Sequence, residues 1–189
     1  MKKIVVFASG SGTNAENIIK YFKGSAIGEV VGVYTNNANA GVIDRAKNNA
    51  VPVTIFTKLE LYESELLQNI NAIQPDLIVL AGFLLKFPDA IITAYPDKII
   101  NIHPALLPKY GGKGMYGMHV HKAVVENKEK ETGITIHYVN ENYDEGATIF
   151  QKQVTVLGTD TPEVVAEKIH ELEQKYFPGV VEDLLKSKS

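Results

Sequence analysis

The sequence of 189 residues contains no cysteine and no tryptophan. Without cysteine, the protein has no disulfide framework, no thiolate metal ligand and no cysteine nucleophile. Long hydrophobic runs are missing too, because no stretch approaches the roughly 18 to 20 apolar residues that cross a bilayer. The apolar run at residues 4–8 is shorter than the roughly 7–15 residues of a secretory signal. We therefore expect a cytoplasmic protein that does not enter a membrane.

A surplus of basic side chains is also absent. The chain has 19 Lys and Arg against 22 Asp and Glu, which gives a net charge of −3. Proteins that bind DNA or RNA need a basic surface to neutralise phosphates, so we expect a small ligand and no nucleic-acid partner. The content of 45% hydrophobic and 22% charged residues is typical of a soluble globular protein. Neither a repeat nor a linker interrupts it, and residues 1–189 are predicted to form a single domain.

Short apolar runs alternate with amphipathic stretches in the first half of the chain. Because these runs are apolar at successive positions, they suit parallel strands that are covered on both faces. The runs are residues 4–7, 30–34, 51–56, 77–80 and 99–102. Two later strand-like runs, 133–139 and 148–156, are joined by a turn at 140–146 and predict an antiparallel addition. The predicted fold is α/β, a Rossmann-like and mostly parallel sheet with helices on both faces.

Two helices are predicted in the second half of the chain, one near residues 118–128 and one at the C-terminal end. The last helix is expected to begin with Thr161 as its cap and Pro162 in its first turn. Pro178 and Gly179 are expected to break or kink it.

A glycine-rich segment, residues 9–15, follows the first predicted strand and opens the first helix. Glycines let the chain turn tightly, and the N–H groups of a helix start form a cradle for phosphate. The segment fits G-x-G-x-x-A, but a dinucleotide site also needs an acid at the end of the second strand, where Asn36 and Asn37 stand. A monophosphate ligand is therefore favoured. The alternative is a plain tight turn with Asn14 as a helix cap.

Asn101 and His103 stand at the carboxyl end of a predicted strand and, two residues apart, share one face. An amide donor beside an imidazole can stabilise an oxyanion and move a proton. Asp144 lies in a turn, and a carboxylate close to His103 would raise the pKa of the imidazole; spacing alone leaves open that it is an ordinary turn residue. His119 and His121 point apart on a helix, so no metal site is expected.

With these motifs in this order, the sequence resembles the phosphoribosylglycinamide formyltransferases over essentially its whole length. The pieces that carry the resemblance are Ala81-Gly82-Phe83, residues 101–108 and the Asp144 turn. The resemblance implies transfer of a formyl group from 10-formyltetrahydrofolate to the amine of 5-phosphoribosylglycinamide (glycinamide ribonucleotide), in de novo purine biosynthesis. It implies a monomer or homodimer that needs no metal.

The resemblance also implies a role for each matching residue. Asn101, His103 and Asp144 would be catalytic, with a protonated His103 and the Asn101 amide stabilising the oxyanion and Asp144 keeping His103 charged. The substrate would be bound by Gly12, Thr13 and Asn14 at its phosphate and by Glu173 at its glycinamide end. The folate would be bound by Leu84, Leu85, Lys86, Phe87, Asn101, Asn140 and Tyr143.

Three features depart from the family pattern. Leu85 stands where relatives often carry Arg, Ala147 replaces a frequent Pro, and the loop 111–117, which is expected to close over the site, is longer than usual. Methionyl-tRNA formyltransferase and formyltetrahydrofolate deformylase share the motifs, but each is expected to carry a further domain for which this chain has no room. A non-catalytic protein that binds a phosphate ligand remains an alternative, and it would not need His103.

Overall fold

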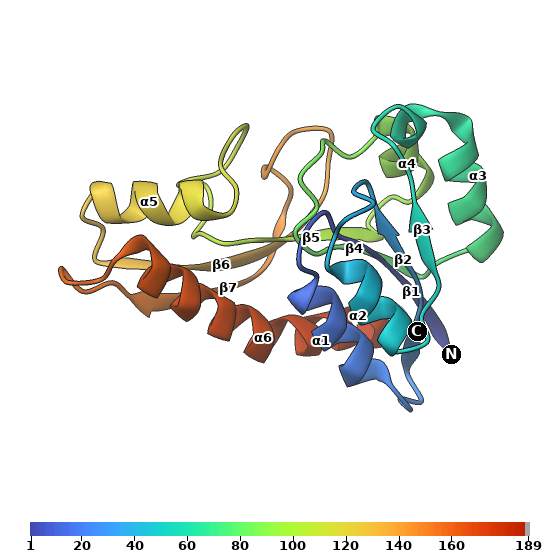
Figure 1. The fold of residues 1–189 in the computed structure, drawn as a ribbon, viewed down its shortest axis with the longest axis horizontal. Helices are drawn as coiled ribbons and strands as arrows, with labels where there is room; N and C mark the ends of the chain where they lie inside the picture. The colour runs from blue at the N-terminus through green and yellow to red at the C-terminus, as the bar shows by residue number, and fades with distance from the viewer. Residues whose placement is uncertain (188–189) are drawn as a thin grey trace.

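A single seven-stranded sheet organises the protein in the computed structural model, which describes residues 1–187. Its strands are β1 (Lys2–Phe7), β2 (Gly28–Thr35), β3 (Val53–Ile55), β4 (Leu77–Leu80), β5 (Ile99–His103), β6 (Glu131–Tyr138) and β7 (Thr148–Thr155). They lie in the order β3-β2-β1-β4-β5-β6-β7 (Figure 1). The first five strands pair in parallel, whereas β6 and β7 are antiparallel to their neighbours. The predicted mostly parallel sheet with an antiparallel addition is confirmed.

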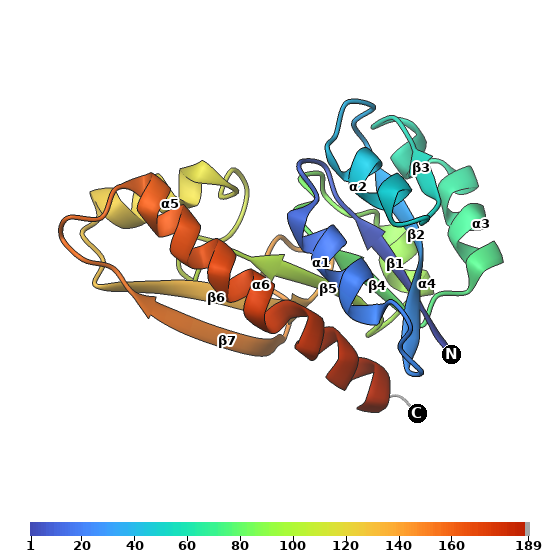
Figure 2. The ribbon, with the colours of Figure 1, turned by 60° about the horizontal axis from the view of Figure 1, so that its bottom comes forward.

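Helices cover both faces of the sheet, as predicted. They are α1 (Thr13–Phe22), α2 (Val42–Asn48), α3 (Ser64–Ile73), α4 (Asp89–Ala94), α5 (Met118–Glu126) and α6 (Pro162–Ser187), with a short 3-10 helix at Glu60–Tyr62. Successive residues of β1 point to opposite faces. Ile4 and Val6 therefore join the core under α1, α2, α5 and α6, while Val5 and Phe7 join the core under α3 and α4 (Figure 2).

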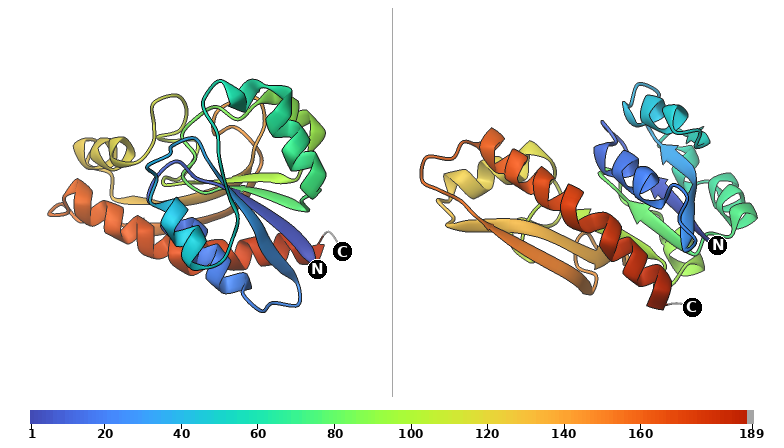
Figure 3. Two further views of the ribbon diagram at one scale, coloured as in Figure 1. Left: turned by 45° about the vertical axis from the view of Figure 1, so that its right-hand side comes forward. Right: turned by 90° about the horizontal axis from the view of Figure 1, so that it is seen from below.

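The strand order creates a crevice at the carboxyl edge of the sheet. β1 lies between β2 and β4, and the chain leaves β1 for α1 on one face but leaves β4 for α4 on the other. Loops that diverge in this way leave room for a ligand between them. On the other side of β5, the hairpin β6–β7 and helix α5 extend away from the parallel strands, whereas α6 packs against α5 and then runs back to pack along α1 (Figure 3).

Helix α6 runs through Pro178, so the first expected outcome, a break, does not occur, and the second, a kink, stays a prediction. Proline has no N–H, and the carbonyl of Gln174, four residues earlier, loses its helical donor. The Asn17 side chain of α1 replaces that donor, because its Nδ2 lies 2.8 Å from the Gln174 oxygen. At the helix start, the Val164 N–H donates to the Thr161 hydroxyl at 3.4 Å, which confirms the predicted cap. No helix in residues 1–187 combines the length and apolar character needed to cross a membrane.

The hydrogen bond between Asn17 and Gln174 leads to a prediction about the free energy of unfolding. Replacing Asn17 by alanine leaves the Gln174 carbonyl without a donor and should lower the free energy of unfolding by about 1 kcal/mol. In a Pro178→Ala background the loss should be smaller, because the N–H of the new alanine can donate to the same carbonyl. Urea denaturation of the four proteins measures both effects. An equal loss in the two backgrounds would show that Asn17 does not compensate for the proline.

Candidate active site

The predicted site segments line one cleft of about 650 Å³ at the carboxyl edge of the sheet. The cleft runs from the glycine-rich loop after β1, past the end of β5, to the turn between β6 and β7. Its walls include residues 10–14, 80–87, 101–104, 112–117 and 139–144, together with Ile169, His170 and Glu173 of α6. Segments that are far apart in the sequence therefore meet around a single cavity, as expected for a ligand site.

His103 and Asp144 face one another in this cleft. The His103 side chain is buried, with 4% of its residue surface exposed, and its Nδ1 lies 3.6 Å from Asp144 Oδ2. Its Nε2 lies 2.7 Å from the Tyr110 carbonyl. Because a carbonyl can only accept, Nε2 carries a hydrogen and Nδ1 is the nitrogen left to exchange a proton beside Asp144.

A tight turn brings Asp144 to that position. Asp144 has a φ of +56°, in the left-handed region that Asp tolerates better than most residues, and its Oδ2 accepts the Gly112 N–H at 3.0 Å. A Cβ at Gly146 would lie 1.7 Å from the Tyr138 carbonyl oxygen, so only glycine lets the turn pack this closely on β6. The glycine thus has a direct role in placing the carboxylate.

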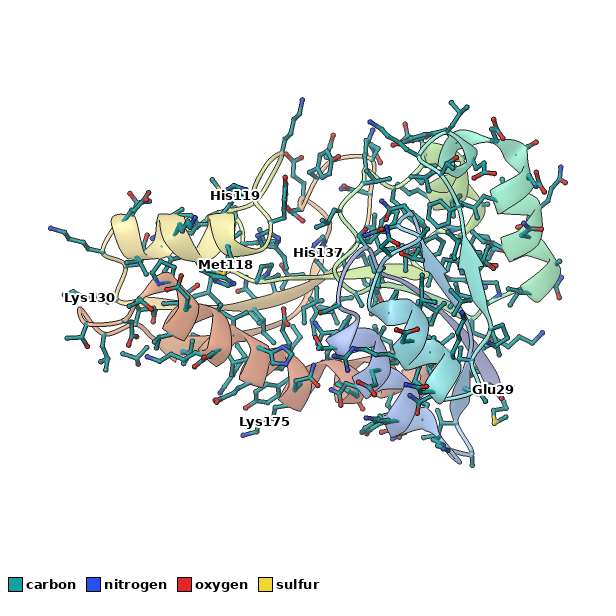
Figure 4. All side chains as sticks on the ribbon, viewed as in Figure 1. Glu29, Met118, His119, Lys130, His137 and Lys175 are labelled. Atoms are coloured by element: carbon teal, nitrogen blue, oxygen red, sulfur yellow. The ribbon has the colours of Figure 1, made fainter. Side chains whose placement is uncertain are left out.

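Asn101 connects to Asp144 through His137, a residue that no sequence motif assigns to the site. The Asn101 Nδ2 lies 3.1 Å from His137 Nε2, and His137 Nε2 lies 3.5 Å from Asp144 Oδ1. The Tyr138 carbonyl accepts a hydrogen bond from His137 Nδ1 at 2.8 Å, and the Nε2 edge of the ring faces Asn101 and Asp144. Figure 4 shows His137 between α5 and the parallel strands. Its pairing opposite Asn101 across β5 and β6 is the signal that could have identified it.

Burial decides the protonation state of His103. Burial lowers the pKa of His103 below its ordinary value of 6.5, and this effect outweighs the nearby Asp144 carboxylate and the Tyr110 carbonyl, which raise it. The lowered pKa favours the neutral form of His103 at pH 7, whereas the resemblance implies a ring that Asp144 keeps charged. For Asp144, burial raises the pKa, but His137, His103 and the Gly112 N–H together lower it, so the carboxyl is ionised.

The glycine-rich loop opens α1 as predicted. Gly12 has a φ of +77°, and a Cβ there would lie 2.4 Å from the Cβ of Val42, so this turn requires glycine. The helix begins at Thr13, and the N–H groups of its first turn have no partner within the helix. Gly12, Thr13 and Asn14 all line the cleft. The loop thus presents N–H groups where an anion can bind.

The Asn14 side chain is not a helix cap, which corrects the alternative interpretation of this turn. Its Nδ2 donates to Glu173 Oε2 at 2.8 Å, and its Oδ1 accepts from Gln174 Nε2 at 2.8 Å. The Asn14 side chain therefore joins α1 to Glu173 and Gln174 of α6, and only its backbone N–H remains to face an anion at this loop. Glu173 lines the cleft, with its Oε2 also 3.8 Å from His170 Nδ1.

The predicted folate-binding residues other than Asn101 line the cleft from two segments. Leu84, Leu85, Lys86 and Phe87 lie after β4, and Asn140 and Tyr143 lie in the turn between β6 and β7. The Phe87 ring packs edge-on against Phe7 at 5.1 Å, within the core under α3 and α4. Leu85, which stands where relatives often carry Arg, packs against the same core.

The two histidines of α5 differ in their surroundings. His119 is exposed, whereas His121 is 5% exposed and lines the cleft. The Nδ1 of His121 is buried without a hydrogen-bond partner among residues 1–187. In that same part of the chain, no three His, Asp or Glu side chains are grouped to hold a metal ion.

The electrostatic balance at His103 can be measured directly. We expect the imidazole signals of His103 to titrate below 6.5 in NMR spectra, because burial dominates. An Asp144→Asn variant removes the charge that raises this pKa, so His103 should titrate at a still lower pH. A wild-type midpoint above 6.5, or a midpoint that the substitution does not lower, would contradict this balance.

Comparisons with known proteins agree with this geometry. The family model described as formyl transferase matches residues 2–181. Phosphoribosylglycinamide formyltransferase of Escherichia coli is 34% identical over 184 residues, which cover 94% of this chain and 84% of that protein. The chloroplastic phosphoribosylglycinamide formyltransferase of Arabidopsis thaliana is 42% identical over 187 residues. That match covers 95% of this chain but only 64% of the Arabidopsis protein.

Solved structures show the same similarity. Phosphoribosylglycinamide formyltransferase from Bacillus halodurans superposes with a TM-score of 0.89 at 36% identity, covering 100% of this chain and 97% of that one. The Streptococcus pneumoniae protein of the same name gives a TM-score of 0.86 at 34% identity, with 97% and 99% coverage. The chain belongs to the phosphoribosylglycinamide formyltransferase family of formyl transferases.

Proposed function

We propose that the protein transfers the formyl group of 10-formyltetrahydrofolate to the amine of 5-phosphoribosylglycinamide. The products are formylglycinamide ribonucleotide and tetrahydrofolate, in de novo purine biosynthesis. The observation that carries this proposal is the single cleft that joins a phosphate cradle at residues 10–14 to the facing pair His103 and Asp144. A phosphorylated amine held at one end can thereby be brought to an acid–base pair at the other.

Each wall of the cleft suits one substrate. The N–H groups of Gly12, Thr13 and Asn14 would bind the phosphate, and the Glu173 carboxylate would accept hydrogen bonds from the glycinamide end. On the opposite wall, backbone groups and apolar side chains of residues 84–87, with Asn140 and Tyr143, would hold the flat ring of the folate. Holding both reactants side by side supplies much of the rate enhancement by orientation.

The chemistry follows from the groups that face the cleft. The substrate amine attacks the formyl carbon, and a C–N bond forms as the carbonyl oxygen becomes an oxyanion. The Asn101 amide has a second hydrogen besides the one directed at His137, and it donates this hydrogen to the oxyanion. Removing one such donor typically reduces turnover by roughly 10²–10³-fold.

His103 is suited to carry the proton between the two nitrogens. The neutral imidazole accepts the amine proton at Nδ1, and the ionised Asp144, 3.6 Å away, stabilises the imidazolium as it forms. The intermediate then collapses, the bond from the formyl carbon to N10 of the folate breaks, and His103 returns the proton to N10. This role replaces the expected one, in which His103 is protonated before the reaction.

Activity assays with purified protein test the proposal. Glycinamide ribonucleotide should be formylated only when 10-formyltetrahydrofolate is supplied, and formate with ATP should not replace it. His103→Ala should reduce kcat by roughly 10²-fold or more, because the proton carrier is lost. Its Kd for the ribonucleotide should stay close to the wild-type value, since the phosphate is bound elsewhere.

His119→Gln is the matched control, because His119 is an exposed histidine outside the cleft. It should keep wild-type turnover. A His103→Ala variant with wild-type turnover would contradict the role given to His103. Wild-type protein that binds the ribonucleotide without formyl transfer would refute the proposed activity and favour the non-catalytic phosphate binder.

A further inference from the structure

Ser9 is a buried residue next to the cleft that forms hydrogen bonds to segments from both of its walls. It is the second residue after β1, is 7% exposed and is not among the residues that line the cleft. Its hydroxyl donates to Asn36 Oδ1 at 2.6 Å and accepts the Leu84 N–H at 3.0 Å. Its own N–H donates to the Gly82 carbonyl at 3.0 Å. One small side chain thus joins the ends of β1, β2 and β4.

Ser9 lies between two segments that bind different substrates in the proposed reaction. Gly10, the next residue, begins the phosphate loop (residues 10–14). Leu84 begins the segment 84–87, which together with Asn140 and Tyr143 forms the folate-side wall. The loops diverge at this point because the chain leaves β1 and β4 toward opposite faces of the sheet. The Ser9 side chain therefore bridges the crevice just beyond the last backbone bonds that join these loops, from the Ala81 N–H to Phe7 and from the Ser9 N–H to Gly82.

Asn36 gains a role from this arrangement. It stands at the end of the second strand, where a dinucleotide-binding protein would carry an acid for the ribose. Here its carboxamide oxygen accepts the Ser9 hydroxyl hydrogen, which leaves the lone pairs of that hydroxyl for the Leu84 N–H. The three groups form a directional chain from Leu84 through Ser9 to Asn36.

The phosphate loop is anchored separately on its other side. The Val42 N–H of α2 donates to the Gly10 carbonyl at 3.2 Å, and Arg45 Nε donates to the Ser11 carbonyl at 2.9 Å. With α2 holding the phosphate loop in place, the bonds of Ser9 determine where residues 82–84 lie relative to it.

We propose that Ser9 is a positioning residue that sets the spacing between the phosphate loop and the folate-side wall. The inference rests on the proposed function, because this spacing fixes how closely the substrate amine approaches the formyl carbon. A misplacement of about 1 Å between reacting groups can cost on the order of 10²-fold in rate. Ser9 itself touches neither substrate.

The test is Ser9→Ala, which leaves the Leu84 N–H and Asn36 Oδ1 without their shared partner. We expect kcat at saturation with both substrates to fall about tenfold or more, the factor that corresponds to one hydrogen bond of typical strength. The Kd of each substrate measured alone should change by less than about threefold, because each wall stays intact. A variant with unchanged kcat, or one whose loss is explained by weaker binding of a single substrate, would overturn the proposal.

Ser25→Ala is the matched control. The Ser25 hydroxyl also accepts a backbone N–H, from Ile27 at 3.1 Å, but it lies in the loop between α1 and β2, outside the cleft. This variant should keep the wild-type kcat even if its stability falls. An equal loss of kcat in both variants would mean that general destabilisation explains the effect, and the proposal would fail.

A second variant keeps the test open if Ser9→Ala does not fold. Asn36→Ala removes the acceptor at the other end of the chain and should lower kcat without changing either Kd; an unchanged kcat would overturn the proposal. If the two single variants fold, the double variant should be no slower than Ser9→Ala. Inactive wild-type protein would refute the proposed function and this inference with it, whereas active wild type with unaffected variants would refute this inference alone.

Discussion

The site depends on an ionised, partly buried carboxylate beside a buried imidazole. Asp144 is held by the Gly112 N–H and lies within 3.6 Å of both His103 and His137. Without such partners, burial would raise the pKa of this carboxyl, and the carboxyl would stabilise an imidazolium less. Because His103 is neutral at rest, the charge of Asp144 acts when a proton arrives at the ring. The pair is therefore arranged for a charge that exists only during the reaction.

The sheet makes this arrangement possible. The parallel strands place the phosphate loop and the folate-side wall at one edge, and β5 brings Asn101 and His103 to the same edge. The antiparallel strand β6 then sets His137 opposite Asn101 and leads into the turn that carries Asp144. The parallel half of the sheet thus provides the binding walls, and the antiparallel addition completes the acid–base groups.

Patterns within a single segment were sufficient to predict the strand types, the glycine turn at Gly12 and the shared face of Asn101 and His103. Such patterns did not predict the features that depend on contacts between distant segments. The helix passes Pro178 because Asn17 of another helix replaces the lost donor, and His103 is neutral because its burial outweighs Asp144. His137 was missed because its role comes from its register with β5. Burial and register are properties of the folded chain, and motif spacing does not contain them.

The most direct test of the central pair is a double-mutant cycle on turnover. kcat for formyl transfer is compared in wild type, His103→Ala, Asp144→Ala and the double variant, with saturation by both substrates confirmed for each. If Asp144 acts by stabilising the imidazolium of His103, its removal costs nothing further once His103 is gone, and the double variant matches the His103→Ala variant. Losses that multiply in the double variant would show that the two residues act independently, and would contradict the account.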